Sequence, residues 1–403
     1  MWEKLFDHML RTIMQTGSFE MTMPSGVRRS YGDGSGVTVR AHIHDIATLR
    51  KILISPEIGL GEAYMEGNLS IEGDDIRGLL SVIVANVGQD HSTGWQKFLA
   101  NWRKFKRRAL QYNPVGTAQR NVAHHYDLSG ELYNLFLDSD RQYSCAYFRA
   151  PGDSLEDAQN GKKTHIASKL LIEPGMRVLD IGCGWGGMGL TLARDFGARV
   201  VGVTLSEEQH KVARSRAEAE SLSDMVEFRL MDYRNVNETF DRIVSVGMFE
   251  HVGAPHYNEY FQHVRDRMTE DGIALIHSIG RSTPPGTTSP WILKYIFPGG
   301  YIPSISEVMQ AVENQNLWPT DIEIWRLHYA ETLRHWYDRF MANIEQVKSL
   351  YDERFCRMWR FYLAAAEMTF RHNRQFVFQL QLSRRQDAVP LTRDYLYGMN
   401  RQT

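Results

Sequence analysis

The chain has 403 residues, more than one typical domain core needs, so we expect two domains. Its formal net charge of −2 and its 23% of charged residues give no global basicity, which argues against a nucleic-acid partner. The three cysteines are odd in number and widely spaced, which favours a reduced cytosolic setting over a disulfide framework and offers no metal-binding pair.

The N-terminal stretch MWEKLFDHMLRTIMQTG mixes charged residues with apolar ones, so it lacks the uninterrupted apolar segment of a signal peptide. Its apolar residues recur at helical spacing and predict an amphipathic helix, for which packing on its own domain is favoured over membrane contact. The longest uncharged apolar run, LLSVIVANV at 79–87, is half of the roughly 18 residues of a membrane span. We therefore predict a cytoplasmic protein without a transmembrane segment.

Short alternating runs and turn glycines over 18–72 predict strands and hairpins, so residues 1 to about 90 are expected to form a small α+β domain. The stretch 95–113, WQKFLANWRKFKRRALQYN, combines an aromatic helical stripe with six basic residues, and no acidic residue occurs from 91 to 126. This pattern suits the surface of an anionic bilayer, and it equally suits a solvated linker helix packed on the next domain.

Residues 112–121, YNPVGTAQRN, have the Pro, Gly and polar content of an interdomain linker. We therefore predict an N-terminal domain at 1–111 and a second domain at 122–403. In the second domain, apolar runs alternate with helical stretches, which predicts an open parallel α/β sheet covered on both faces. Two later runs, 322–328 and 376–383, bracket long helices at about 331–372 and predict an antiparallel tail. The parallel strands are expected at 177–182, 198–204, 225–230, 240–247 and 273–280.

The stretch VLDIGCGWGG at 178–187 places four glycines directly after a buried strand. The spacing G-x-G-x-x-G is met, but a nicotinamide-binding fold would place an acid at the end of the second strand, where Gly202 and Thr204 stand instead. No Gly-Lys-Ser/Thr follows, which excludes a P-loop. The distinguishing feature of this loop is Asp180 inside the strand.

VLDIGCGWGGMGLTLA resembles the first motif of class I S-adenosylmethionine-dependent methyltransferases. The resemblance is closer to the cyclopropane-fatty-acyl-phospholipid synthases and their mycolic-acid relatives, and it extends over nearly the whole chain. It implies a Rossmann-like seven-stranded methyltransferase domain preceded by a small α+β domain. The segments that carry it are HHYDLSGELYNLFLDSDRQYSCAYF (124–148), VVGVTLSEEQ (200–209), VGMFEHVG (246–253) and LIHSIG (275–280), with weaker support from GEAYMEGNLSIEGDD, WYDRF and FYLAAAEMTF.

The resemblance implies a reaction in which a methyl carbon of S-adenosylmethionine is added across a cis double bond of a phospholipid acyl chain. An alkene is a poor nucleophile, so the site must exclude water and align the double bond with the sulfonium. Transfer leaves a carbocation, and ring closure then requires a base. In this family the base is thought to be a bound bicarbonate. The residues that would hold it are Cys145, Glu250, His277, Ile279 and Tyr329.

In these roles Glu250 would share a proton with the ion, while His277 and Tyr329 would donate hydrogen bonds. Without the resemblance, Cys145 would be interpreted as a core residue and His277 as the partner of a backbone group. His251, beside Glu250, is expected to be structural. Asp180 is expected to order the glycine loop rather than to touch the ligand. The positions matching S-adenosylmethionine contacts are Tyr143, Ser144, Asp180, Gly182, Gly184, Thr204, Leu205, Gln209, Asp232 and Tyr233.

Segment 281–304, rich in Pro, Gly and aromatic residues, is interpreted as a substrate lid. Several aromatic residues are candidates for an acyl channel that would stabilise the cation by π contacts, although most are expected simply to pack. These aromatic residues are Phe249, Tyr257, Trp291, Tyr295, Phe297 and Tyr301.

One position departs from the family pattern. Some members carry a cysteine in the late helix where this chain has Ala366, and the carbocation mechanism does not require that thiol. The role of the neighbouring Glu367 is left open by the sequence.

Three alternatives stay open. A methyltransferase that makes methyl-branched or methylene acyl chains would use the same donor and lipid. A nicotinamide oxidoreductase is disfavoured by the missing acid, and a lipid-binding protein with a vestigial fold is disfavoured by the intact cofactor positions. The expected partners are an unsaturated phospholipid and an anionic membrane surface on the cytoplasmic side. The hypothesis for residues 1–111 is docking on that surface, including docking as a homodimer.

Overall fold

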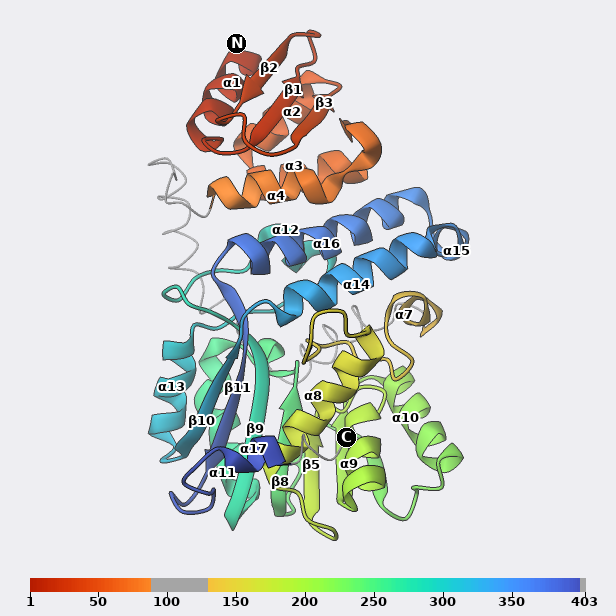
Figure 1. The fold of residues 1–403 in the computed structure, drawn as a ribbon, viewed down its shortest axis with the longest axis vertical. Coiled ribbons are helices and arrows are strands. Elements are labelled where there is room, and N and C mark those ends of the chain that lie inside the picture. The colour runs from red at the N-terminus through yellow and green to blue at the C-terminus, as the bar shows by residue number, and fades with distance from the viewer. Residues whose placement is uncertain (88–129, 399–403) are drawn as a thin grey trace. The chain divides into compact units, whose positions relative to one another are not determined.

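A computed structural model describes residues 1–87 and 130–398 (Figure 1). The basic stretch at 95–113 and the predicted linker at 112–121 lie outside the described residues. Within the described part, no helix combines the length and the apolarity that crossing a membrane requires. The described residues form two compact units, which are treated separately below.

The first unit comprises residues 1–87 together with two later segments, Thr287–Phe297 and Ala330–Gln375. The later segments belong to it because α16 (Glu353–His372) packs against α3 (Pro56–Met65) and α4 (Ile76–Val87). The predicted boundaries at 111 and 122 follow chain order and stay predictions, since packing unites segments that are distant in sequence.

A four-stranded sheet in the order β2-β1-β3-β4 forms the N-terminal part of this unit. β1 (Ser18–Thr22) pairs parallel with β3 (Thr38–Ile43) and antiparallel with β2 (Arg28–Tyr31), and β4 (Leu69–Ile71) pairs antiparallel with β3. Alternate residues of β1 and β3 are buried, as the alternating sequence predicts. The predicted N-terminal α+β region is therefore confirmed.

The predicted first helix is α1 (Trp2–Ile13), which buries Phe6 and Leu10 on one face. The predicted long C-terminal helices are also present. The remaining helices with residues in this unit are α2 (Ile46–Ile54), α12 (Pro290–Tyr295), α14 (His328–Ala342) and α15 (Ile344–Leu350).

The second unit contains a seven-stranded sheet in the order β10-β11-β9-β8-β5-β6-β7, which confirms the predicted Rossmann-like class I methyltransferase fold. Five strands are parallel, and β11 pairs antiparallel with β10, as the tail pattern predicted. The strands are β5 (Arg177–Ile181), β6 (Arg199–Thr204), β7 (Val226–Leu230), β8 (Phe240–Val246), β9 (Met268–Arg281), β10 (Trp318–Trp325) and β11 (Gln375–Ser383).

Helices cover both faces of this sheet. Successive residues of its central strands point to opposite faces, so neighbouring residues belong to different cores. Val178 of β5 belongs to one hydrophobic core, which α8, α9 and α10 complete, whereas Leu179 belongs to a second core completed by α11 and α13. This two-sided burial explains the near-continuous apolar runs in the sequence. The helices are α7 (Gly130–Phe136), α8 (Leu155–Leu170), α9 (Gly187–Phe196), α10 (Glu207–Ala219), α11 (Tyr257–Arg267), α13 (Ile305–Asn314) and α17 (Asp394–Gly398).

Candidate functional site

The glycine loop leaves β5 at its carboxyl end and leads into α9. Gly182 has φ of +82°, and a Cβ atom there would lie 2.8 Å from the side chain of Met248. Gly186 has φ of +86°, and a Cβ atom there would lie 2.7 Å from the ring of Phe228. Both conformation and space therefore require glycine at these two positions. The loop can therefore pack its backbone closely against Met248 and Phe228 while Gly182 and Gly184 line the adjacent cavity.

A pocket opens at this carboxyl edge of the sheet, where ligands of open α/β folds bind. All ten residues predicted for the S-adenosylmethionine site line it, including Asp180, which was expected to order the loop. These residues lie in the stretch before α8, in β5 and the glycine loop that follows it, at the ends of β6 and β7, and at the start of α10. The ten residues are Tyr143, Ser144, Asp180, Gly182, Gly184, Thr204, Leu205, Gln209, Asp232 and Tyr233.

Polar groups on the β6 and β7 side of the pocket are held by local hydrogen bonds. Thr204 Oγ1 donates to Gln209 Oε1 at 2.9 Å, which fixes the amide at the start of α10. Asp232 accepts two hydrogen bonds from the side chain of Arg234, at 2.9 and 2.8 Å. The pocket therefore presents a pre-oriented amide and a carboxylate, groups that can bind the hydroxyl and amine groups of a nucleoside.

Asp180 lines the pocket and is almost fully buried, and its Oδ2 atom has no hydrogen-bond partner among the described residues. Burial raises the pKa of this carboxyl to about 7, against the opposing effect of the positive charge of Lys162. Asp180 was predicted to order the loop. Its unpartnered oxygen beside the cavity makes it available to a ligand as well.

Sequence reasoning missed several residues of the pocket wall. His251, predicted to be structural, lines the pocket, and burial lowers the pKa of its imidazole to about 4. Trp185 also lines the pocket, and its indole Nε1 donates to Glu208 at 3.0 Å. The glycine-loop motif itself contains Trp185, so its position in that motif was the available signal.

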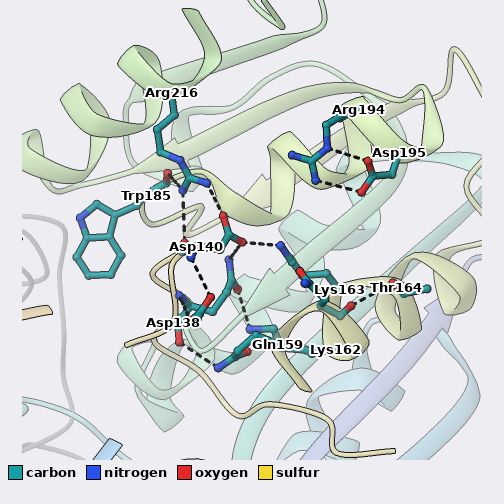
Figure 2. A network of polar contacts seen from close by, with 12 residues as sticks. Asp138, Asp140, Gln159, Lys162, Lys163, Thr164, Trp185, Arg194, Asp195 and Arg216 are labelled. Atoms are coloured by element: carbon teal, nitrogen blue, oxygen red, sulfur yellow. Dashed lines mark hydrogen bonds and ion pairs between the residues drawn. The ribbon is translucent and has the colours of Figure 1, made fainter. Parts of the chain in front are cut away.

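A network of charged side chains supports the pocket from behind (Figure 2). Asp140 accepts from Lys163 Nζ at 2.6 Å and from Arg216, and Arg216 also donates to the carbonyl oxygen of Trp185 at 2.9 Å. These contacts join α8, α10 and the glycine loop to the segment that carries Tyr143 and Ser144. The network therefore fixes the loops that form the pocket.

None of the five predicted catalytic residues lines this pocket, but Cys145 and Glu250 are sequence neighbours of the lining residues Ser144 and His251. Glu250, between the lining residue His251 and the buried Phe249, accepts a hydrogen bond at Oε1 from the backbone N–H of Ile279 at 2.7 Å. The structure thus brings together two of the five residues, from the segments after β8 and within β9.

The other three predicted residues are largely buried. The Nδ1 atom of His277 lies 3.2 Å from Gln379 Nε2, and Cys145 Sγ donates to the carbonyl oxygen of Ala146 at 3.4 Å. Tyr329 lies in the first turn of α14. Cys145 directly follows Ser144 of the pocket wall, so the predicted cradle and the pocket share a segment.

The titration of Glu250 and His277 favours uncharged forms. Burial raises the pKa of the Glu250 carboxyl, and its Oε2 atom is inaccessible and has no hydrogen-bond partner among the described residues. Burial also lowers the pKa of His277 well below its ordinary value. Glu250 can therefore hold or share a proton, and His277 is a neutral imidazole.

Two further interpretations can be placed in the fold. Phe249, Tyr257 and Tyr301 belong to the hydrophobic core beneath the sheet, so they pack as was expected of most of the aromatic residues. The proposed lid at 281–304 contains α12 (Pro290–Tyr295). Its role as a lid stays a prediction.

Glu367, whose role the sequence left open, lies fully buried in the first unit. Both of its oxygens accept from Arg77, at 2.9 and 2.8 Å, and Oε1 also accepts from Arg371 at 2.8 Å. These contacts join α4 to α16 and give Glu367 a structural role beside Ala366.

A family model described as mycolic acid cyclopropane synthetase matches residues 115–380 of this chain. The chain belongs to this family. A second model, described as a domain of unknown function, matches residues 2–92. The predicted resemblance is therefore confirmed, and the protein is an S-adenosylmethionine-dependent methyltransferase of the cyclopropane synthase type.

Similar proteins cover most of the chain. The cyclopropane-fatty-acyl-phospholipid synthase of Escherichia coli K12 is 38% identical over 83% of this chain and 85% of its own length. The tuberculostearic acid methyltransferase UfaA1 of Mycobacterium tuberculosis is 36% identical over 81% of this chain and 79% of its own.

Solved structures resemble the methyltransferase part. The cyclopropane synthase MmaA2 of Mycobacterium tuberculosis shares 31% identity and a TM-score of 0.64, covering 67% of this chain and 98% of that one. The mycolic acid cyclopropane synthase CmaA1, complexed with SAH and CTAB, shares 32% identity and a TM-score of 0.63, covering 68% and 99%.

Proposed function

We propose that this enzyme transfers a methylene group from S-adenosylmethionine to a cis double bond in an acyl chain of a phospholipid, forming a cyclopropane ring. The observation that carries the proposal is that all ten predicted cofactor positions line one and the same pocket. The 38% identity to a phospholipid cyclopropane synthase supports the choice of substrate.

S-adenosylmethionine supplies an electrophilic methyl group when bound. The chain's own contribution is to hold that donor against the glycine-loop backbone, with Asp232 and Gln209 on the nucleoside side and Asp180 and Ser144 beside the loop. Because an alkene is a weak nucleophile, orientation and exclusion of water account for most of the catalysis that the protein can provide.

Ring closure requires loss of a proton from the transferred methyl group, and the residues around Glu250 suit that step. A strong nucleophile here would trap a carbocation, whereas burial raises the pKa of Glu250 and so favours its protonated, weakly nucleophilic form. The nearby Cys145 thiol is buried and donates its hydrogen bond to a backbone oxygen. We propose that Glu250 shares a proton with the bound base that takes up the proton in this step.

Bicarbonate fits this group of residues and, when bound, would supply the base. The observation that favours the fit is Glu250 Oε2, a buried acceptor without a partner among the described residues, which a hydroxyl donor would satisfy. Glu250, His277, Ile279, Cys145 and Tyr329 would hold the ion. Its presence is part of the proposal and is tested by removing dissolved carbonate from the assay.

The decisive test is mass spectrometry of lipids from a host that expresses this chain and is fed methyl-labelled methionine. The expected result is a gain of one labelled carbon on unsaturated acyl chains, together with chemical loss of the double bond. A host expressing E250Q is the matched control and should accumulate little labelled lipid. No labelled lipid with the wild-type chain, despite S-adenosylmethionine binding by the purified protein, would contradict the phospholipid substrate.

A second candidate is methyl transfer to the same double bond with a different proton loss, giving a methyl-branched or methylene chain. It is favoured by similar proteins with other names, the tuberculostearic acid methyltransferase and a probable fatty acid methyltransferase of Pseudomonas putida, 37% identical. The same labelling experiment separates the two, because this product gains the same mass but gives a branched chain or retains a double bond.

We further propose that residues 1–111 dock the enzyme on the anionic inner face of the membrane, including as a homodimer. Support comes from the basic residues within 95–113, which lie outside the described residues. Flotation with anionic vesicles should show weaker binding when these cations are neutralised. Unchanged binding at low salt would contradict the proposal. The five positions to neutralise are Arg103, Lys104, Arg107, Arg108 and Lys106.

A further inference from the structure

A lysine is buried directly behind the wall of the pocket. Lys162 on α8 has no exposed surface, and its Nζ atom donates to Gln142 Oε1 at 2.7 Å and to Ser144 Oγ at 2.6 Å. Among the described residues, both acceptors are neutral oxygens and no carboxylate forms an ion pair with this ammonium. Its neighbour Lys163, in contrast, is paired with Asp140 at 2.6 Å. An unpaired buried lysine is costly to fold, which suggests that it serves a ligand.

The contact between Lys162 and Ser144 determines that the Ser144 hydroxyl acts as the donor in any second hydrogen bond that it forms. An ammonium group can only donate, so the Ser144 oxygen accepts from it and the serine hydroxyl keeps its own proton for another acceptor. Ser144 lines the pocket. Gln159 Nε2 donates to the Ser144 carbonyl oxygen at 3.0 Å and to that of Gln142 at 3.2 Å, which holds the backbone of this segment in place. The hydroxyl of Ser144 is therefore available to an acceptor in the pocket.

An opposite charge lines the same pocket. Asp180 has a buried oxygen without a partner among the described residues, and the charge of Lys162 opposes the rise that burial causes in the pKa of its carboxyl. The two groups thus interact electrostatically, yet no ion pair joins them among the described residues. Burial lowers the pKa of Lys162 to about 7, against the opposing effect of the nearby carboxylates of Asp138 and Asp140, neither of which forms an ion pair with it among the described residues.

A buried acid and a buried base that do not neutralise each other match a ligand end that carries both charges. The amino-acid end of S-adenosylmethionine is such a zwitterion, with an ammonium and a carboxylate on one carbon. Its ammonium would find Asp180, and its carboxylate would need a hydrogen-bond donor in the same pocket, which the Ser144 hydroxyl could supply.

We propose that Lys162 is a positioning residue that directs the Ser144 hydroxyl toward the carboxylate of the donor's methionine part. The inference rests on the proposed use of this pocket for S-adenosylmethionine. Lys162 itself stays behind the pocket wall and acts through Ser144.

The test measures binding of two compounds by calorimetry: S-adenosylhomocysteine, which has the amino-acid end, and methylthioadenosine, which lacks it. K162M should bind S-adenosylhomocysteine about tenfold more weakly, the size expected for one hydrogen bond to a charged group. Its affinity for methylthioadenosine should stay within about twofold of wild type, which also shows that the variant is folded. K211M, on the exposed face of α10, is the control and should match wild type for both compounds.

A double-mutant cycle distinguishes action through Ser144 from a general structural effect. If Lys162 acts through this hydroxyl, the variant K162M/S144A should bind S-adenosylhomocysteine no more weakly than S144A alone. The proposal would be overturned if the losses of affinity in the two single variants multiplied in the double variant. It would also be overturned if K162M lost the same affinity for both compounds. Unchanged S-adenosylhomocysteine binding in K162M with a raised bicarbonate requirement would also overturn it, assigning the lysine to the neighbouring anion site.

Failure of this inference is distinguishable from failure of the proposed function. If the wild-type enzyme binds neither compound, the proposed use of the pocket is wrong. If the wild type binds both compounds and K162M binds each of them with wild-type affinity, only the proposed role of Lys162 is wrong.

Discussion

Two buried acidic side chains of the first unit are held by basic groups, whereas two of the second unit, beside or next to the pocket, are not. In the first unit, Glu367 is held by two arginines, and Glu62 accepts from Lys294 at 2.7 Å and from Tyr295 at 2.6 Å. Burial opposes ionisation of Glu62, but hydrogen bonds from Lys294, Lys51 and Tyr295 outweigh it and lower its pKa to about 2. In the second unit, Asp180 and Glu250 each keep a buried oxygen without a partner among the described residues.

This difference separates buried carboxylates that stabilise the fold from buried carboxyl groups that can bind a ligand or a proton. A buried carboxylate surrounded by basic groups stabilises the packing of the elements it joins, and its removal leaves those groups unpaired. A buried carboxyl without a partner costs folding free energy, so its retention beside a pocket points to a ligand or a proton. The following predictions test this contrast.

The largest effect is expected for E250Q, because glutamine cannot take up or share a proton. We expect kcat to fall about a thousandfold, within the usual range for loss of a general acid or base. The affinity for S-adenosylhomocysteine should stay within about threefold, since Glu250 does not line the pocket. Steady-state assays with vesicles of unsaturated phospholipid measure both, and E270Q, at an exposed position on β9, serves as control. A kcat within tenfold of wild type would contradict the role of Glu250.

E367Q should destabilise the protein without changing ligand affinity. Its loss of charge leaves Arg77 and Arg371 without their shared carboxylate, and we expect the free energy of unfolding to fall by about 3 kcal/mol. Urea unfolding measures this, and calorimetry with S-adenosylhomocysteine should show wild-type affinity. An unchanged unfolding midpoint would show that Glu367 does not stabilise the fold and would contradict this prediction.

D180N should have the opposite effect on stability, with a defined pH dependence. The pKa of Asp180 is about 7 in the folded protein and 3.8 in the reference state, so between these values the folded state retains a proton that the unfolded state releases. Stability from this group therefore falls as the pH rises through that window, and asparagine removes the penalty. We expect D180N to be more stable than wild type by about 2 kcal/mol at pH 8 and equally stable near pH 4.

The same variant should bind S-adenosylhomocysteine more weakly at pH 8, because it loses the carboxylate proposed to face the ligand's ammonium. Denaturant titrations at the two pH values and calorimetry provide the measurements. Lower stability of D180N at pH 8 would mean that Asp180 supports the loop rather than the ligand.

The smallest effect is expected for R385Q. Arg385 pairs with Asp271 at 3.0 Å and with Asp387 at 2.7 Å, but all three side chains are exposed to solvent and salt. The free energy of unfolding should change by no more than about 0.5 kcal/mol. A loss comparable to that of E367Q would remove the distinction between buried and exposed ion pairs on which the comparison depends.

The sheet and the glycine loop of the pocket could be predicted because each depends on a pattern of residues that are close together in the sequence. Strands buried on two faces produce continuous apolar runs, and the glycine loop needs conformations that only glycine adopts cheaply. The ten pocket residues were predicted from the family resemblance, and most of them lie at or just after strand ends, which meet at one edge of a parallel sheet.

The residues that sequence reasoning missed depend on partners that are distant in sequence. Helix α8 reads as polar, LEDAQNGKKTHIASKL, yet Lys162, Lys163 and Lys169 are all buried. Lys163 reaches Asp140 and Lys169 reaches Glu323, and no periodicity in a single sequence reveals such pairings. The grouping of residues 330–375 with the N-terminal unit was hidden for the same reason.

The place of β11 within the sheet has a consequence for how the chain acquires its structure during synthesis. This strand comes last in the sequence but lies between β10 and β9, and its Gln379 contacts His277 on β9. Until the ribosome has delivered residues 375–383, one edge of β9 has no partner and remains open to pairing with other chains. The surroundings of His277, one of the predicted proton-handling residues, are therefore completed only after residues 375–383 have been made, although most of the pocket is encoded earlier in the chain.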